Sequence, residues 1–144
     1  MTIIQMSNPD GRPDAMPGAG DAAGLKCKTM RATLTAALAL NDVLTGPKLA
    51  AGSTIVDVII AASDLDSNGA PTITLDVGYG VDPDYFIAAS NIGQAGGIAR
   101  ASASTAKPLT LVSDDTIDVT VHAAPATGQA GTVDLTVVFL PPSA

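Results

Sequence analysis

The segment Asp64-Leu65-Asp66-Ser67-Asn68-Gly69 combines oxygen-bearing side chains with a glycine, and it matches the opening of a calcium loop, D-x-D-x-N-G. Calcium takes several hard oxygen ligands, and the glycine permits the sharp turn that such a loop needs. The twelfth position of an EF-hand loop carries a bidentate Glu, but this sequence has Leu75 there, inside an alternating apolar stretch. The EF-hand interpretation therefore fails.

A partial cation site remains an alternative at the same segment. Its weak candidate ligands are Asp64, Asp66 and Asn68, and Asp82 or Asp84 from a later loop would have to assist. Asp, Ser, Asn and Gly are also the ordinary residues of turns, because their side chains hydrogen-bond the local backbone. We therefore predict a polar turn, no bound metal and no cofactor.

Nucleophilic chemistry has two candidate residues, His122 and Cys27, each the only one of its type. A histidine base needs a Ser or Cys nucleophile beside it and an acid that orients it, and the pattern marks no such nucleophile. Cys27 lies between Lys26 and Lys28, which is a setting that lowers a thiol pKa, but an inert thiol is the simpler interpretation. We predict no catalytic residue and no enzymatic activity.

The composition excludes several classes of partner. The chain has 144 residues and a formal net charge of −7, and all of its carboxylate side chains are Asp. An acidic surface does not suit the phosphates of nucleic acids or anionic membranes, so neither is expected as a partner. No apolar run approaches the ~20 residues of a membrane-spanning helix, and the first residues do not resemble a signal peptide.

Two segments near the end of the chain alternate apolar and polar residues, 116–122 and 132–139. Side chains along a strand point to opposite faces in turn, so each segment predicts a strand with one buried face. The buried sets are Ile117, Val119 and Val121 in the first segment, and Val133, Leu135, Val137 and Phe139 in the second. We expect the two strands to form an antiparallel pair.

Further strands are predicted over 26–38, 53–62 and 71–79, with helical propensity at 36–40. In the second of these, alternation places Val56, Val58 and Ile60 on one face and Ile55, Asp57 and Ile59 on the other. Apolar residues on both faces predict a central strand or a second contact on the outer face. Residues 82–100 are ambiguous, because Asp82-Pro83 suits the start of a helix while the following residues suit a strand.

These segments predict an all-β protein, with an antiparallel β-sandwich or jelly-roll-like domain over residues 26–144. Residues 1–25 are rich in Pro, Gly and Asp and predict an extended or flexible N-terminal arm. Such an arm gains order against a partner, with Ile3, Ile4 and Met6 as its apolar anchors.

The stretch 54–140 resembles small virion structural proteins of tailed bacteriophages, which are commonly encoded beside the major capsid protein. The residues that carry the resemblance are Val56-Asp57-Val58-Ile59, Asp64-Leu65-Asp66, Thr74-Leu75-Asp76-Val77-Gly78, Asp82 to Ser90, Gly93 to Gly97, Thr116 to Val121, Pro125 to Gly128 and Gly131-Thr132-Val133. The resemblance implies a head decoration or cement protein that binds the outside of an assembled capsid, often as a trimer. The implied partner is the major capsid protein, and the implied location is the surface of a virion assembled in the host cytoplasm.

Alternative functions stay open at this point. A fibre, spike or tail role belongs to the same structural class, and a calcium- or carbohydrate-dependent binding module is a second class. The absence of Trp speaks against sugar binding, which commonly uses an aromatic platform. For docking on a capsid, the candidate residues are Ile3, Ile4 and Met6 in the arm and Ile55 and Ile59 on the outer face of a strand.

Overall fold

The structure is a computed structural model that describes residues 1–6 and 24–143. Its strands are β1 (Ile3–Gln5), β2 (Lys26–Leu34), β3 (Val43–Thr45), β4 (Lys48–Leu49), β5 (Thr54–Ala62), β6 (Thr74–Tyr79), β7 (Asp82–Ser90), β8 (Gly97–Arg100), β9 (Leu109–Thr110), β10 (Asp115–Thr116), β11 (Asp118–Ala123) and β12 (Gly131–Leu140). Within the described residues, the 3₁₀ turn η2 (Ile92–Gln94) precedes β8, and no α-helix is present. The all-β prediction is confirmed.

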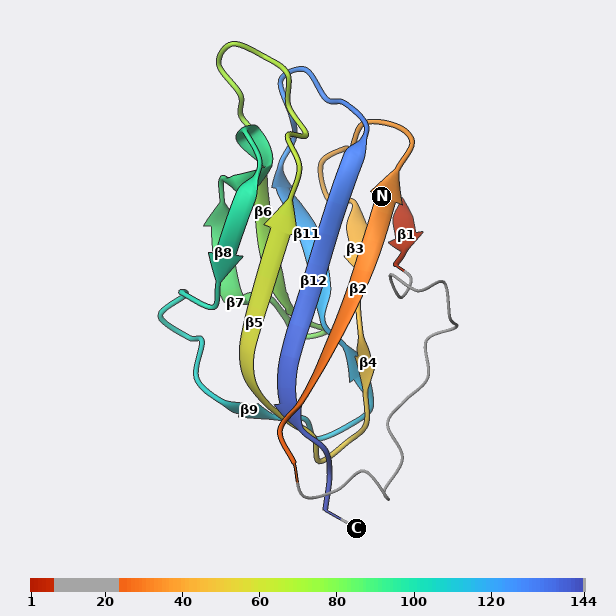
Figure 1. The fold of residues 1–144 in the computed structure, drawn as a ribbon, viewed down its shortest axis with the longest axis vertical. Helices are drawn as coiled ribbons and strands as arrows, with labels where there is room; N and C mark the ends of the chain where they lie inside the picture. The colour runs from red at the N-terminus through yellow and green to blue at the C-terminus, as the bar shows by residue number, and fades with distance from the viewer. Residues whose placement is uncertain (7–23, 144) are drawn as a thin grey trace.

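Two sheets pack face to face (Figure 1). Sheet A has the strand order β1-β3-β11-β6-β7, and sheet B has the order β2-β12-β5-β8, with β9 also paired to β5. The short pair β4 and β10 continues the β3 and β11 strands beyond a break at Gly46. A Cβ at Gly46 would lie 2.0 Å from the carbonyl oxygen of Ile117, so only glycine permits the chains to cross this closely. The sandwich prediction is confirmed, while the jelly-roll connectivity stays a prediction.

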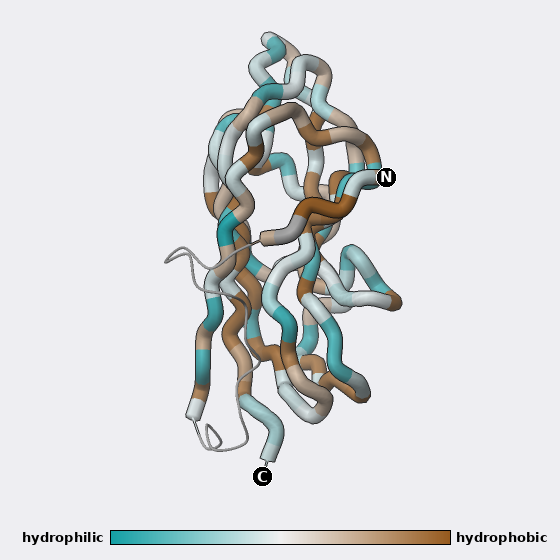
Figure 2. The backbone as a smooth tube through the Cα atoms, turned by 90° about the vertical axis from the view of Figure 1, so that its right-hand side faces the viewer, coloured by the Kyte–Doolittle hydropathy of each residue, from teal (hydrophilic) through white to brown (hydrophobic). Residues whose placement is uncertain are grey.

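The core lies between the sheets and is almost entirely aliphatic. Figure 2 turns the molecule by 90° and shows the two layers from the side. Fully buried side chains come from both layers, and they include Leu75, Val119, Leu135 and Phe139. Burying a residue of this kind stabilises a fold by about 1.5–3 kcal/mol relative to leaving it exposed. The core is therefore built from the alternating faces that the sequence predicts.

The predicted pairing of the last two strands is wrong, although their buried faces are right. β11 hydrogen-bonds to β3 and β6 in sheet A, and β12 hydrogen-bonds to β2 and β5 in sheet B. The connector 124–130 crosses from one sheet to the other, so the two apolar faces meet across the core. Alternation shows which face of a strand is buried, but it does not identify the neighbouring strand.

The face assignment in β5 is wrong at its start. Between Val138 and Phe139 the pairing with β5 shifts, and Phe139 lies opposite Ile55. Val56 is the extra residue of this β-bulge, so the alternation is reset there. Ile55 is completely buried and Val56 is exposed, whereas Ile59 lies on the outer face as predicted, half-buried.

Two ambiguous segments are resolved by the structure. Residues 82–90 form β7, an edge strand of sheet A, and the alternative of a helix is wrong. Residues 36–40 form an irregular connection, so their helical propensity is overridden. Ala is a strong helix former, but a segment this short does not outweigh the strands on either side of it.

The first residues belong to sheet A rather than to a separate arm. β1 runs parallel to β3, with Ile3 opposite Val43 and Ile4 opposite Leu44. Met6 is only 3% exposed and contributes to the core. The remainder of the predicted arm, residues 7–23, lies outside the described residues.

Candidate interaction surfaces

The carboxylate of Asp66 joins two loops at one end of the sandwich, the β5–β6 loop and the β11–β12 connector. Asp66 is 1% exposed, and both of its oxygens accept hydrogen bonds from backbone N–H groups. Oδ2 accepts from Thr72 at 2.7 Å, Ala126 at 2.8 Å and Ile73 at 3.3 Å, while Oδ1 accepts from Thr127 at 2.8 Å and Asn68 at 3.4 Å. The loops are also bridged by backbone bonds from Ser67 to Thr127 and from Gln129 to Leu65. The D-x-D-x-N-G segment thus has a structural role, because Asp66 connects the two loops.

This environment lowers the pKa of Asp66 well below its ordinary range. Burial alone would raise the pKa, but the backbone N–H groups of Thr127, Thr72, Ala126 and Ile73 outweigh it because they stabilise the ionised form. The side chain is therefore a carboxylate whose acceptor positions are already engaged.

The three weak candidate ligands at this loop already accept hydrogen bonds from the backbone. Asp64 is exposed and its Oδ1 accepts from the Asp66 N–H at 3.0 Å, and Asn68 Oδ1 accepts from the Ala70 N–H at 2.9 Å. The three weak candidate ligands thus make successive turns in which each side chain accepts from a backbone N–H two residues further on. Across residues 1–6 and 24–143, no group of three or more His, Cys or Asp side chains is placed to hold a metal ion.

His122 lies beside the carboxylate of Asp76. Its Nδ1 is 2.9 Å from Oδ2 of Asp76, while Oδ1 of Asp76 accepts from the Ala89 N–H at 2.6 Å. Asp76 is 6% exposed although it points away from the core, and the sequence pattern gave no sign of this burial. Cys27 is exposed at the start of β2 in sheet B, whereas His122 lies on β11 in sheet A. Asp76 on β6 is thus tied to β11 through His122 and to β7 through the Ala89 N–H.

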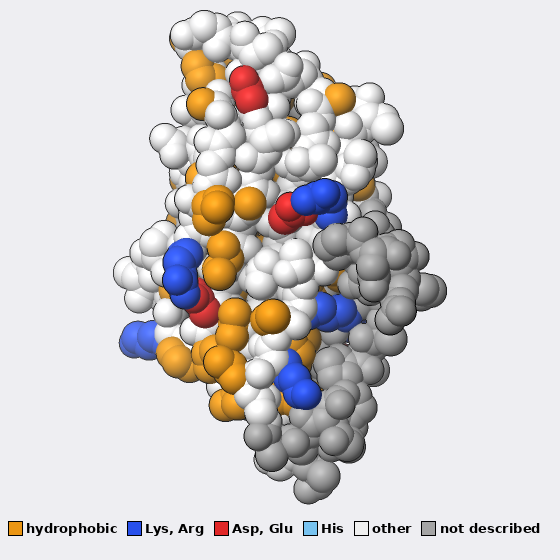
Figure 3. Space-filling view, in the orientation of Figure 1, with side chains coloured by type: hydrophobic (Ala, Val, Ile, Leu, Met, Phe, Trp, Pro, Cys, Tyr) orange, Lys and Arg blue, Asp and Glu red, His pale blue; other side chains and the backbone are white. Residues whose placement is uncertain are grey.

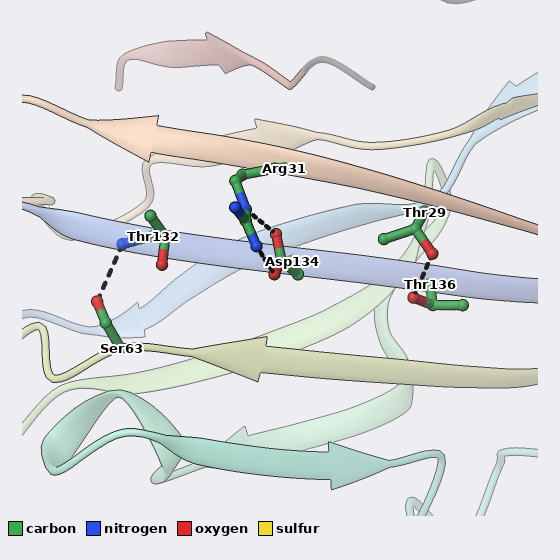
Figure 4. A network of polar contacts seen from close by, with 6 residues as sticks. All are labelled: Thr29, Arg31, Ser63, Thr132, Asp134 and Thr136. Carbon is green, nitrogen blue, oxygen red and sulfur yellow. Dashed lines mark hydrogen bonds and ion pairs between the residues drawn. The ribbon is translucent and has the colours of Figure 1, made fainter. Parts of the chain in front are cut away.

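The outer face of sheet B carries cross-strand polar pairs (Figure 4). Arg31 and Asp134 are direct partners on β2 and β12 and form a two-point ion pair, with Nε–Oδ1 at 2.6 Å and Nη2–Oδ2 at 2.7 Å. The hydrogen bond and charge of Asp134 raise the pKa of the Arg31 guanidinium. At the next pair on the same face of the sheet, the hydroxyl oxygens of Thr29 and Thr136 are 2.7 Å apart. Cross-strand pairs of this kind stabilise the pairing of neighbouring strands.

Apolar side chains lie among these polar pairs. Figure 3 shows them mainly over the lower half of sheet B, with Lys and Arg side chains around them. The exposed members include Ile98, Val56 and Leu140, and Ile59 is half-buried beside the Arg100–Asp57 ion pair.

The docking candidates from the sequence are distributed unevenly in space. Ile3 is 63% exposed and Ile59 is half-buried, so both offer surface to a partner. Ile4 packs against the core, and Met6 and Ile55 are buried. Ile55 is therefore withdrawn as a docking residue, because the bulge in β5 turns it inward.

An apolar hollow of about 170 Å³ lies where the β6–β7 turn meets the segment 109–115. Its apolar lining residues are Tyr79, Val81, Leu109, Leu111 and Val112. These two valines are 83% and 97% exposed. The sequence pattern gave no signal for this hollow, because both valines lie outside the alternating segments.

The described part of the chain contains no helix long and apolar enough to cross a membrane. No protein-family model matches the chain, and no curated protein matches it.

Solved phage structures do match the fold. The chain is 33% identical to a chain in "Capsid of Ralstonia phage GP4", with a TM-score of 0.80 over 99% of this chain and 100% of that one. It is 28% identical to a chain in "Cyanophage Pam1 capsid asymmetric unit", with a TM-score of 0.76 over 94% and 98% of the two chains. A chain in "Acidic stable capsid structure of Helicobacter pylori bacteriophage KHP30" shares the fold at 16% identity, with a TM-score of 0.64 over 85% and 91%.

Proposed function

Because this chain belongs to the family of the GP4 capsid chain and is a phage virion structural protein, we propose that it decorates the outer surface of the capsid. In this role it binds a shell built by the major capsid protein, after assembly in the host cytoplasm, and it acts as a cement protein. The proposal gives it no catalytic role, and we propose that it binds as a trimer. The match over the whole of both chains is the observation that carries the proposal.

The distribution of apolar residues supports a subunit that is added to a shell rather than one that builds it. Subunits that share obligate interfaces bury 2,000–5,000 Å² or more of total surface, and these interfaces are strongly apolar. In this protein the apolar faces of the alternating strands are buried in the chain's own core. The large apolar side chains left exposed in the described residues lie in small groups on different elements, such as Val81 with Val112 at the hollow and Val56, Ile98 and Leu140 on sheet B. Such a surface suits docking at a few points.

The test is to mix the purified protein with capsids assembled without it and to image the particles by cryo-electron microscopy. We expect density of one sandwich per bound copy on the outside of the shell, grouped in threes. Decorated particles should also withstand heating better than bare ones, because binding to the assembled state stabilises it. Shells that form from this protein alone, or density on the inner surface, would contradict the proposal.

A further inference from the structure

We propose that the apolar hollow between the β6–β7 turn and the segment 109–115 is the point at which this protein docks on the capsid, and that it receives an apolar side chain flanked by Lys or Arg. This inference rests on the proposed function and names the surface and the partner chemistry for it. Monomeric proteins seldom leave large apolar groups exposed side by side unless the patch binds something.

The hollow has room for one side chain. Its volume is about 170 Å³, and an apolar cavity of roughly 150 Å³ in another protein accommodates benzene. One lining residue, Tyr79, packs edge to face against Tyr85 with the ring centroids 5.4 Å apart, and Tyr85 packs in the same way against Phe86 at 4.8 Å. A preformed pocket of this kind loses little conformational entropy when it is filled.

Asp115 joins the two segments that carry the exposed valines. Asp115 Oδ2 accepts from the N–H of Gly80, next to Val81, at 3.1 Å, and its Oδ1 accepts from the Thr116 N–H at 2.8 Å. The turn itself is fixed at Gly78, where a Cβ would lie 2.0 Å from the carbonyl oxygen of Asp82. Val81 and Val112 are therefore presented from two segments that are joined to each other.

The charge around the hollow indicates the partner. Asp82 and Asp84 follow Val81, and Asp114 and Asp115 follow Val112. Asp84 hydrogen-bonds to Asp82 and, with burial and its own charge, raises the pKa of Asp82, as expected where two carboxyl groups crowd together. Two lysines adjoin the site, Lys48 on β4 and Lys107 before β9, so the acidic groups are in excess. A basic partner surface is complementary to this acidic region. The attraction would raise the rate of association and orient the partner as it binds.

The experiment measures occupancy of capsids that lack the protein, by co-sedimentation over a range of protein concentrations. We expect the double variant Val81→Ser/Val112→Ser to bind at least tenfold more weakly than the wild type. The matched control Ile98→Ser removes a 72% exposed apolar side chain from β8 in sheet B and should bind like the wild type. Asp84→Lys should weaken binding, whereas Asp64→Lys, at the opposite end of the sandwich, should not.

Melting temperatures of all variants should stay within roughly 2 °C of the wild type, because exposed positions contribute little to stability. Wild-type binding together with undiminished binding of the double variant would overturn the inference and leave the proposed function intact. A loss of binding in Ile98→Ser alone would assign docking to sheet B and also overturn it. A double variant that loses self-association in sedimentation but keeps its capsid occupancy would identify a second copy as the occupant. If the wild type itself does not bind, the proposed function and this inference fall together.

Discussion

The backbone N–H of Thr127 donates a 2.8 Å hydrogen bond to Oδ1 of Asp66, across 61 positions of the sequence. This contact and its neighbours hold the crossover between the sheets against the β5–β6 loop, so a single carboxylate organises one end of the sandwich. The motif that resembles a cation loop in the sequence is thus a structural element in the fold.

The first prediction concerns the substitution Asp66→Asn. An amide places an NH₂ group where one oxygen now accepts, so buried N–H donors would face a donor, and unsatisfied buried groups are costly. We expect the melting temperature to fall by at least roughly 5 °C. Asp64→Asn is the matched control, because Asp64 is exposed, and it should change the melting temperature by less than half as much. Equal effects of the two substitutions would contradict the role assigned to Asp66.

The sequence could predict the turn at Asp64–Gly69 but not its partners. Asp, Ser, Asn and Gly in succession carry local turn information, whereas the donors at Ala126 and Thr127 lie about 60 positions away. Long-range pairing leaves no local pattern in a single sequence. For the same reason, the alternation at 116–122 and 132–139 does not identify the neighbours of these two strands. Their buried faces are predictable because alternate side chains along a strand point to the same face.

Single-residue irregularities set a further limit on prediction. The bulge at Val56 reverses the alternation and moved Ile55 from the expected outer face into the core. Val81 and Val112 line one hollow although they are 31 positions apart, and Asp115 links the two segments that carry them. The candidate docking hollow was therefore beyond the reach of sequence periodicity.

The second prediction is the pH dependence that Asp66 contributes. Its pKa is lower in the folded state than the ordinary value of about 4, so its contribution to stability is present above that value. The contribution is lost as the pH falls below about 4, where the unfolded state takes up a proton first. We expect the difference in melting temperature between the wild type and Asp66→Asn to shrink from pH 7 to pH 3. A difference that stays constant over this range would show that ionised Asp66 is not the stabilising species.

The third prediction is that calcium has no effect on stability. The acceptor positions of Asp66 are engaged by N–H donors, and a cation would have to displace them. Neither EDTA nor added calcium should move the melting temperature by more than roughly 1 °C, whereas a ligand that binds only the folded state raises it. A rise of several degrees in the melting temperature with calcium would contradict this prediction and support a cation site.

The fourth prediction is that Asp118→Asn is tolerated, in contrast to Asp66→Asn. Burial raises the pKa of Asp118, and hydrogen bonds from the Gly46 N–H at 3.0 Å and the Thr116 hydroxyl at 2.9 Å only partly offset it. An amide can keep the Gly46 bond, and its NH₂ group can donate to the hydroxyl oxygen of Thr116. Because a raised carboxyl pKa costs stability at neutral pH, we expect an unchanged or higher melting temperature at pH 7. The gain should vanish below about pH 4, where Asp118 is protonated in both states, and a marked loss at pH 7 would contradict the assignment.

The last prediction separates the structural and surface roles of the first residues. Met6 is 3% exposed in the core, whereas Ile3, on the same strand segment, is 63% exposed. Met6→Ala should therefore lower the free energy of unfolding by about 2–3 kcal/mol, which is typical of truncating a buried side chain. Ile3→Ala should change it by less than about 0.5 kcal/mol, as is usual for surface substitutions. Denaturant unfolding of the two variants measures both values, since the linear extrapolation gives the free energy in water. If Met6→Ala is as stable as the wild type, β1 does not belong to the sandwich in solution, and the first residues are then available to a partner as the sequence predicts.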